Sequence, residues 1–211
     1  KIDKMKFLKN AVIDTIEKRK KIGFLKDTKK WATESAIFSK HALRIAGHPV
    51  MEDWETDYMK ALAKIATLNG GKVLEIGYGL GLSAKAIQSH NIDNHYVIEC
   101  NVDLVKKAIK DFPILIKKNR FHIFSGFWQD VTPLFANNLL DGILFDTYPL
   151  TEEEIHANHF WFFKEAYRLL KPGGIFTYYS DEARNFSENH ILKLMEAGFK
   201  RENIKFEICN V

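Results

Sequence analysis

Apolar residues follow two alternating rhythms along most of this chain. Short apolar runs typical of strands cover residues 72–77, 95–99, 121–125, 141–146, 175–180 and 203–209. Between them, apolar residues spaced three and four apart predict helices over 81–90, 102–110, 151–170 and 187–197, with a short helix before 138. Strands that alternate with helices predict an α/β fold, with a mostly parallel twisted sheet and helices on both of its faces.

The segment before this alternating region is predicted to form helices. One face of its first helix carries the apolar residues Met5, Leu8, Val12 and Ile16. A second helix is expected over 51–67. We therefore divide the chain into an N-terminal helical lid or appendage, residues 1–48, and an α/β domain, residues 49–211. Sheets of this kind usually have one further antiparallel strand beside the last one, so we expect this chain to be trimmed at its ends.

Composition places the chain among ordinary globular proteins. It has 211 residues, 46% hydrophobic and 27% charged, enough for one α/β domain and an appendage. No apolar run is long enough to cross a bilayer, and no signal-peptide pattern opens the sequence. Cys100 and Cys209 lack metal-ligand spacing and are interpreted as reduced thiols. We expect a cytoplasmic protein that does not bind membranes.

The formal net charge of +4 is unevenly distributed. Residues 1–30 contain the run Lys18-Arg19-Lys20-Lys21 and the pair Lys29-Lys30. Such a run could bind an acidic protein partner, although a solvated helix face is the interpretation we favour. No aromatic residues alternate with the lysines, so we expect no nucleic-acid binding.

A glycine-rich turn follows the first strand of the alternating region. The run 72–76 holds Glu75, and Gly77, Gly79 and Gly81 follow at every second position. The next apolar strand ends in a second acid, Glu99. A strand, a glycine turn, a helix, a second strand and an acid are typical of a nucleoside site, in which the acid binds the ribose hydroxyls. A glycine turn without a ligand remains the alternative.

The spacing also indicates which nucleoside binds. A dinucleotide site requires G-x-G-x-x-G, whereas here Gly81 comes one residue early and Leu82 stands in the expected place. Glu75 would face a pyrophosphate, which disfavours an NAD-dependent dehydrogenase. S-adenosylmethionine has an ammonium, a sulfonium and no phosphate, and it suits Glu75 better.

Two carboxylates are candidates for the chemistry. Asp146 ends a buried apolar strand and would lie at the carboxyl edge of the sheet, unless it caps a turn. Glu55 lies four residues before Met59 on the same face of the helix predicted over 51–67. His156 and His159 are three residues apart but have no third ligand, so we expect no metal.

Several motifs resemble those of the guanidinoacetate N-methyltransferase family. The motifs are Pro-Val-Met-Glu-x-Trp-Glu-Thr-x-Tyr-Met over 49–59, Asp-Gly-Ile-Leu-x-Asp-Thr-Tyr-Pro-Leu over 141–150, and Arg-Leu-Leu-Lys-Pro-Gly-Gly over 168–174. The resemblance covers about residues 41–209. It implies a class I methyltransferase fold of the Rossmann-like, seven-stranded type, with S-adenosylmethionine as the cofactor and no metal.

The resemblance also implies site residues. Those on the cofactor side are Met59, Glu75, Gly77, Gly79, Gly81, Glu99, Cys100, Asn101, Gly126, Phe127, Trp128 and Asp146. Those on the substrate side are Trp54, Glu55, Asp146, Thr147, Tyr148 and Tyr179. Trp31 is matched to an aromatic residue that closes over the site. Aromatic residues at the spacing seen near Glu55 more often belong to a core than to a binding site.

Guanidine chemistry explains why two acids are needed. A guanidinium ion is planar and charged, and its nitrogens have no free lone pair. Glu55 and Asp146 together could bind this fork in bidentate geometry, and Asp146 could take the proton as the methyl group is transferred. We therefore expect a guanidino N-methyltransferase acting on a small molecule such as guanidinoacetate or free arginine. The alternatives are a protein arginine N-methyltransferase and an idle cofactor-binding module. The segment after Tyr179 is shorter than in the family, which leaves the substrate open.

Overall fold

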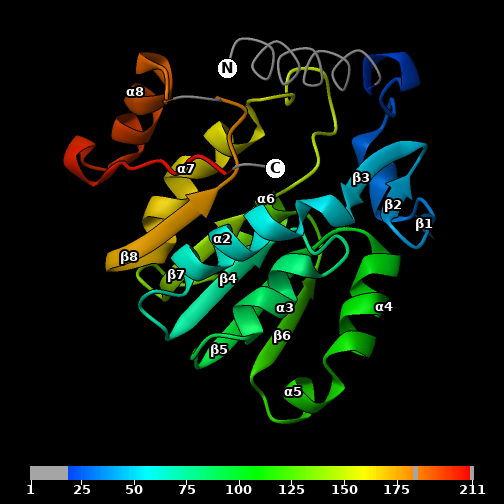
Figure 1. Ribbon diagram of the computed structural model, residues 1–211, viewed down its shortest axis with the longest axis horizontal. Helices are drawn as coiled ribbons and strands as arrows, with labels where there is room; N and C mark the ends of the chain where they lie inside the picture. The colour runs from blue at the N-terminus through cyan, green and yellow to red at the C-terminus, as the bar shows by residue number, and fades with distance from the viewer. Residues whose placement is uncertain (1–18, 183–184, 210–211) are drawn as a thin grey trace.

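A parallel five-stranded sheet forms the centre of the molecule. The computed structural model describes residues 19–182 and 185–209. The strand order is β6-β5-β4-β7-β8, and every neighbouring pair is parallel (Figure 1). The strands are β4 (Lys72–Ile76), β5 (Asn94–Glu99), β6 (Phe121–Ser125), β7 (Leu140–Phe145) and β8 (Leu170–Tyr178). The predicted α/β fold with a parallel sheet is confirmed.

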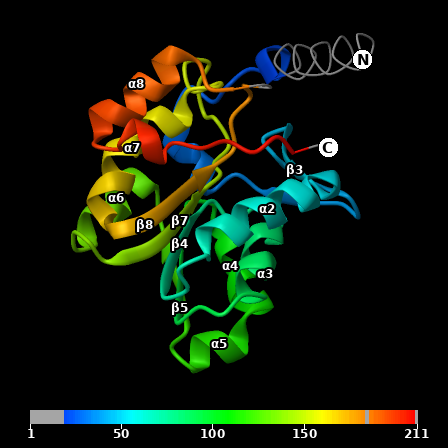
Figure 2. The ribbon, with the colours of Figure 1, turned by 60° about the vertical axis from the view of Figure 1, so that its left-hand side comes forward.

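Helices cover both faces of this sheet. One face carries α2 (Thr56–Ala66), α3 (Leu82–Gln88) and α4 (Val102–Asp111). The other face carries α7 (Asn158–Leu169), with α8 (Glu188–Ala197) beyond it (Figure 2). Shorter helical segments are α5 (Pro113–Lys117), α6 (Trp128–Val131), η3 (Thr132–Leu134) and η4 (Arg201–Asn203). The helix predicted over 151–170 begins only at Asn158, because turns occupy 151–157.

Alternation along each strand assigns its side chains to the two faces. Val73 and Val97 belong to the core cluster that includes α2, α3 and α4, whereas Leu74 and Ile76 pack with Phe162 of α7. These side chains are almost fully buried, and each contributes roughly 1.5–3 kcal/mol by leaving water. The sheet is therefore anchored from both sides, and the carboxyl ends of its strands are held in fixed positions.

A second, antiparallel sheet lies before α2. Its strands are β1 (Ala36–Phe38), β2 (Ala42–Ile45) and β3 (His48–Glu52), preceded by η1 (Thr28–Ala32) and followed by η2 (Asp53–Glu55). Ala46 and Gly47 join β2 to β3 with positive φ angles of 49° and 81°, the conformation that suits a two-residue hairpin. Leu43 and Met51 from this sheet are buried in the same core cluster as Met59 of α2.

This sheet corrects the predicted helical appendage. Within 19–48, the described residues form a helical turn at 19–22, η1 and two strands, and the boundary predicted after residue 48 falls inside β3. The helix expected over 51–67 starts at Thr56. Strands of three to five residues are too short for alternation to distinguish them from helices. The helix predicted from Met5 to Ile16 lies outside the described residues.

The strand predicted over 203–209 is also absent from the described part of the chain. Ile204, Phe206 and Ile208 alternate as a strand requires, but no described strand pairs with this segment. Alternation decides which side chains share a face, whereas a strand also needs hydrogen bonds to a neighbour. This prediction was wrong because it rested on the side chains alone.

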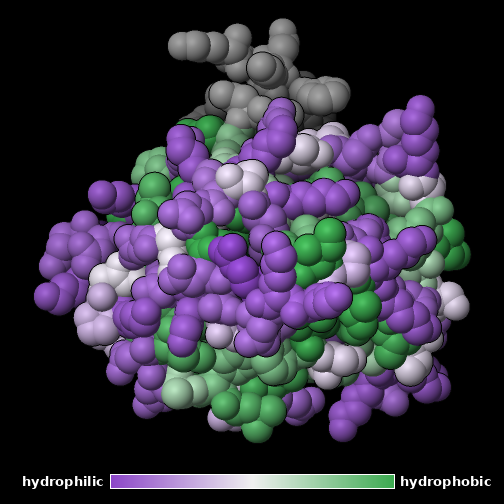
Figure 3. All heavy atoms as spheres, turned by 90° about the horizontal axis from the view of Figure 1, so that it is seen from below, coloured by the Kyte–Doolittle hydropathy of each residue, from purple (hydrophilic) through white to green (hydrophobic). Residues whose placement is uncertain are grey.

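The surface at the amino ends of the parallel strands is neither uniformly hydrophilic nor uniformly hydrophobic. Hydrophilic side chains alternate there with small hydrophobic groups (Figure 3). No helix within the described residues has the length and apolar content needed to cross a bilayer. A large cavity lies at the opposite, carboxyl edge of the sheet.

Candidate active site

A cavity of about 1020 Å³ opens at the carboxyl edge of the parallel sheet. Its floor comes from the segments that follow β4, β5, β6 and β7, and its other walls come from β3, η2 and the N-terminal segment. The lining residues thus come from both sheets. This position is where open α/β sheets bind ligands.

Glycines let the turn after β4 approach its neighbours closely. Gly77 has a φ of 87°, and a Cβ atom there would lie 2.1 Å from the carbonyl oxygen of Asp146. Gly79 has a φ of 52°, and its Cβ would lie 2.8 Å from the sulfur of Met51. A side chain at either position would therefore strain the turn and separate the segments that form the cavity floor.

Glu99 ends β5 and faces the cavity with its carboxylate held in place. One oxygen accepts the backbone N–H of Tyr78 at 2.8 Å, and the other accepts the N–H of Asn101 at 2.7 Å. Burial raises the pKa of Glu99, and these hydrogen bonds oppose the increase. Each oxygen keeps a free lone pair that could accept a hydroxyl, so the residue fits the ribose of a nucleoside. Four more predicted cofactor residues line the same region: Cys100, Gly126, Phe127 and Trp128.

Glu75 is not where the sequence interpretation placed it. Its carboxylate is fully buried, accepts the hydroxyl of Ser83, and lies 3.0 Å from Nε2 of His95. It does not line the cavity. Alternation along β4 turns Glu75 toward α3, on the same face as Val73, so it cannot touch a ligand cation directly.

Three other predicted cofactor residues also stay outside the cavity lining. Met59 is fully buried in the core, and Gly81 forms the left-handed cap of α3. Asn101 caps α4, and its amide donates to the carbonyl oxygens of Trp31 and Glu34. Asn101 thus ties the N-terminal segment to the sheet edge. These three positions serve the fold around the site.

The two candidate carboxylates line the same cavity. Glu55 is the last residue of η2, and Asp146 follows β7 directly. One oxygen of Glu55 accepts the backbone N–H of Glu52 at 2.6 Å, and the other accepts the hydroxyl of Tyr58. The backbone N–H of Asp146 donates to the carbonyl oxygen of Ile76 at 3.0 Å. The carboxylate of Glu55 is thus fixed by local hydrogen bonds before any substrate binds, whereas Asp146 is held through its backbone at the end of β4.

Their surroundings change how these acids titrate. Burial, and then the nearby charges of Glu55 and Glu75, raise the pKa of Asp146 to about 7 against the opposing charge of Arg19. Burial also raises the pKa of Glu55, while its hydrogen bonds from Tyr58 and Glu52 oppose the increase. A carboxylate with a pKa near neutrality is a stronger base than an ordinary one, which suits a proton acceptor.

Aromatic side chains form the walls around these acids. Tyr58 and Tyr179 lie with ring centroids 5.2 Å apart, and Trp54 is 57% exposed at the rim. Tyr148 stacks on Trp31 with centroids 5.4 Å apart. All five line the cavity, as does Thr147, whose carbonyl and hydroxyl oxygens accept the amide of Asn158.

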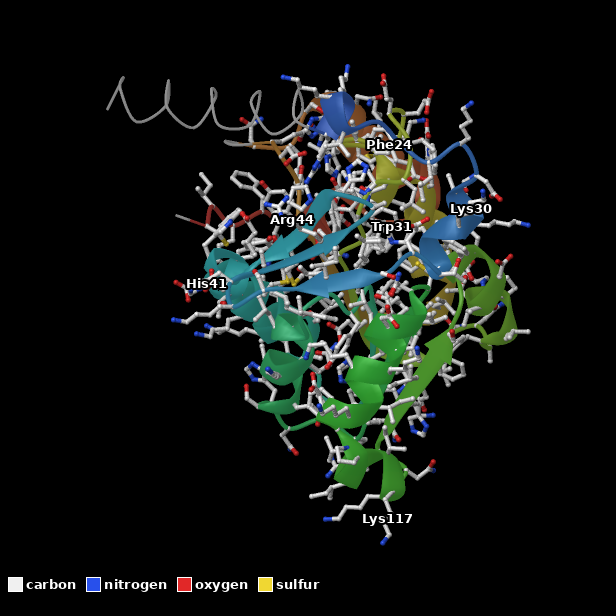
Figure 4. All side chains as sticks on the ribbon, turned by 90° about the vertical axis from the view of Figure 1, so that its right-hand side faces the viewer. Phe24, Lys30, Trp31, His41, Arg44 and Lys117 are labelled. Atoms are coloured by element: carbon white, nitrogen blue, oxygen red, sulfur yellow. The ribbon has the colours of Figure 1, made fainter. Side chains whose placement is uncertain are left out.

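His48 supports this aromatic wall from behind. Its Nδ1 lies 3.1 Å from the Tyr148 hydroxyl, and its Nε2 lies 2.8 Å from the carbonyl oxygen of Gly23. The rings of Phe24 and Trp31, both labelled in Figure 4, lie with centroids 5.3 and 6.0 Å from the His48 ring. The N-terminal segment is therefore connected to the cavity wall through one buried histidine.

The cavity-lining residues that sequence reasoning missed include Arg19, Met51, Glu52 and Tyr58. The Met51 sulfur accepts the backbone N–H of Leu80 at 3.2 Å and covers the glycine turn. Arg19 stood within a lysine-rich run that was interpreted as a solvated helix face. Gly47, which closes the β2–β3 hairpin, was the available signal that Met51 belongs to a strand.

The two histidines considered as metal ligands have other surroundings. His156 contacts the carboxylate of Asp181. His159 is buried on α7, and burial lowers its pKa to about 3. The described residues contain no group of three side chains suited to hold a metal ion.

The parallel sheet and its edge cavity define a class I methyltransferase-type fold. Two solved structures of spermidine synthase share it, each with a TM-score of 0.52 and 19% identity. One, in complex with a transition-state analogue, is matched over 68% of this chain and 56% of its own. The other, from Thermotoga maritima, is matched over 77% and 60%. At this identity the likeness shows the fold alone.

The chain belongs to the guanidinoacetate N-methyltransferase family, whose model matches residues 25–211. This confirms the resemblance seen in the motifs. The chain is similar to "Protein arginine N-methyltransferase 2" of Candida glabrata, with 30% identity over 73% of this chain and 37% of the relative. The protein of the same name from Kluyveromyces lactis is 32% identical, over 62% of this chain and 32% of the relative. The chain thus spans about a third of the length of these relatives. The chain is thus a member of a methyltransferase family.

Proposed function

We propose that this protein is an S-adenosylmethionine-dependent N-methyltransferase that acts on the guanidino group of a small molecule. One observation carries the proposal. Glu55 of η2 and Asp146 after β7 line one cavity, and the same cavity contains the glycine turn and Glu99. A site for a flat cation therefore adjoins a site that fits a nucleoside.

Each residue then has a defined task. Glu99 would bind the ribose hydroxyls, while the backbone around Gly77 and Gly79 leaves room for the rest of the cofactor. When bound, the cofactor supplies an electrophilic methyl group. Glu55 and Asp146 would accept hydrogen bonds from the guanidinium nitrogens and orient one of them.

Asp146 is the proton acceptor in this mechanism. The nitrogen can form its new bond to carbon only as it loses a proton, because the guanidinium ion has no free lone pair. The burial that raises the pKa of Asp146 to about 7 makes this carboxylate a suitable base. Glu55 is already engaged with Tyr58 and the backbone of Glu52, so orienting the substrate is the role that suits it.

A protein arginine side chain is the second candidate substrate. The names of the relatives favour it, since several are called "Protein arginine N-methyltransferase 2". Trp54 and Tyr179, 57% and 46% exposed at the rim, could contact a peptide that carries the arginine. The guanidine chemistry at Glu55 and Asp146 would be the same for either substrate.

Isotope transfer separates these functions. The protein is incubated with methyl-labelled S-adenosylmethionine and guanidinoacetate, free arginine or a protein extract. We expect label in the small guanidino compounds. Label only in protein would favour the second candidate, and cofactor binding without any transfer would contradict both and indicate an idle binding module.

A further inference from the structure

Arg19 brings a positive charge into the cavity that holds Glu55 and Asp146. It lies in the helical turn at 19–22, and its carbonyl oxygen accepts the backbone N–H of Gly23 at 3.2 Å. The carbon at the centre of its guanidinium group lies 4.9 Å from the centroid of the Tyr148 ring. This geometry is a cation–π contact, which fixes the plane of the group against the aromatic wall.

Packed aromatic residues and His48 hold Arg19 in position. His48 connects the Tyr148 hydroxyl to the carbonyl oxygen of Gly23, four residues after Arg19. Tyr148 also stacks on the buried Trp31. The backbone that carries Arg19 and the ring beneath its guanidinium group therefore belong to one packed unit, so the charge is presented from a fixed platform.

Arg19 has an unused donor. Its Nε atom is buried and has no hydrogen-bond partner among the described residues. A buried N–H without an acceptor costs about 1–3 kcal/mol, which marks a place where an acceptor is expected. No described hydrogen bond joins Arg19 to Glu55 or Asp146, and both oxygens of Glu55 already have other donors. The guanidinium group of Arg19 thus leaves the two acids available to a substrate.

The charges of the cavity indicate which substrate this arrangement suits. A ligand that is only cationic would be attracted by Glu55 and Asp146 but repelled by Arg19. A guanidino acid carries a positive and a negative end, and each end would meet an opposite charge. An arginine residue within a peptide offers neutral amides in place of the carboxylate, and would leave Arg19 unpaired.

We propose that Arg19 is a specificity-determining residue whose guanidinium group binds the carboxylate of a small guanidino acid while Glu55 and Asp146 bind the guanidino end. This inference rests on the proposed function and adds to it the residue that selects the far end of the substrate. Two N–H groups of Arg19 can meet the two oxygens of a carboxylate in a bidentate pair. The Nε–H that has no partner among the described residues would be one of them.

The test compares guanidino compounds whose far ends carry different charges. Methyl transfer is measured with guanidinoacetate, with ethylguanidine, whose tail is neutral, and with agmatine, whose tail is cationic. The wild-type protein should prefer guanidinoacetate in kcat/KM, although acids dominate the guanidine end of the cavity. In Arg19→Gln, the ratio of kcat/KM for guanidinoacetate to that for ethylguanidine should fall roughly 10- to 100-fold. Arg19→Lys should restore part of this ratio.

Lys20→Gln is the matched control, because it removes one charge from the same turn at an exposed side chain outside the cavity lining. It should keep the wild-type ratio. Equal losses for all three compounds in Arg19→Gln, or a gain for all three, would overturn the proposal, as would methylation of Arg19 itself seen by mass spectrometry. If Arg19→Gln fails to fold, the wild-type protein alone still tests the proposal, because a preference for agmatine over guanidinoacetate would overturn it. Failure of the proposed function looks different, since no guanidino compound would then be methylated.

Discussion

The cofactor half and the substrate half of the cavity are built in different ways. The cofactor half lies on one edge of the parallel sheet, and its residues fall within 77–128 of the chain. The substrate half brings together Arg19, η2, the segment after β7 and Tyr179. The cofactor half is formed by the loops that follow neighbouring parallel strands. The substrate half forms only when segments that are distant in the sequence pack together. The cofactor half therefore depends on one edge of the sheet, whereas the substrate half depends on contacts between distant segments.

The two halves of the cavity also differ in the hydrogen-bond donors that hold their side chains. Backbone N–H groups of the sheet edge fix Glu99. In the substrate half, side chains also hold one another: Glu55 accepts the Tyr58 hydroxyl as well as one backbone N–H, and His48 lies within hydrogen-bond distance of the Tyr148 hydroxyl. Single substitutions should therefore alter substrate use while cofactor binding persists.

Asp146→Asn should separate the halves most clearly. The amide keeps the shape of the side chain but cannot accept the proton or pair with a guanidinium charge. We expect turnover to fall roughly 10²–10⁴-fold, the range for loss of a general base. Affinity for S-adenosylhomocysteine should change only a few-fold. Single-turnover methyl transfer and calorimetry measure the two quantities.

The control for this variant is Asp130→Asn, an exposed position on α6 outside the cavity lining. It should match the wild type in both measurements. Turnover near the wild-type rate in Asp146→Asn would remove this residue from the role of proton acceptor. An equally large loss of cofactor affinity would show that the two halves cannot be separated here.

Glu99→Gln should have the converse effect. The amide keeps one oxygen acceptor but loses the charge that strengthens hydrogen bonds to hydroxyl groups, each worth about 1.5–3 kcal/mol. We expect cofactor affinity to fall roughly 10- to 100-fold, with KM for the guanidino compound little changed at saturating cofactor. Calorimetry with S-adenosylhomocysteine provides the measurement, and unchanged affinity would take Glu99 out of the cofactor site.

Glu75→Gln should affect cofactor affinity less than Glu99→Gln does. Glu75 lies outside the cavity, bonded to Ser83 and close to His95. We expect this variant to lose stability, because a buried network is disturbed, with a smaller change in cofactor affinity than in Glu99→Gln. The opposite order of affinities would restore the direct role that its sequence position suggested.

These two acids illustrate what sequence can and cannot provide. Both end or nearly end an apolar run, and the motif makes both candidates. Glu99 is the last residue of β5 and faces the cavity, whereas Glu75 comes one residue before the end of β4 and turns under α3. A one-residue difference reverses the face of a strand. Sequence alone fixes strand ends too loosely to decide this.

The substrate half was predictable only where family motifs covered it. Glu55, Asp146 and Tyr148 were identified through the resemblance, and all three line the cavity. Arg19 was not, because a basic residue inside a lysine-rich run is usually solvated and no motif includes it. Its role depends on the fold of β1–β3 and on the contact with Tyr148, neither of which has a local signature.

The smallest predicted effect concerns stability and its dependence on pH. The pKa of Asp146 is raised in the folded protein to about 7 from an ordinary value of 3.8. Such a group favours the folded state most when it is protonated, so its contribution is complete below about pH 4 and is lost as pH rises through 7. The ionised carboxylate therefore opposes folding at pH 8, where the neutral amide of the Asp146→Asn variant would carry no such cost.

Asp146→Asn should thus be more stable than the wild type at pH 8, by about 1–2 kcal/mol after allowance for the solvent that reaches the cavity. At pH 4.5 the two proteins should unfold at nearly the same denaturant concentration. Urea titrations at both pH values, with Asp130→Asn beside them, measure the difference. A gain that is equal at the two pH values would indicate repacking around the amide. A gain confined to high pH would show that the substrate half keeps an acid that is useful for proton transfer and unfavourable for folding, while the cofactor half, held by backbone hydrogen bonds, is unchanged.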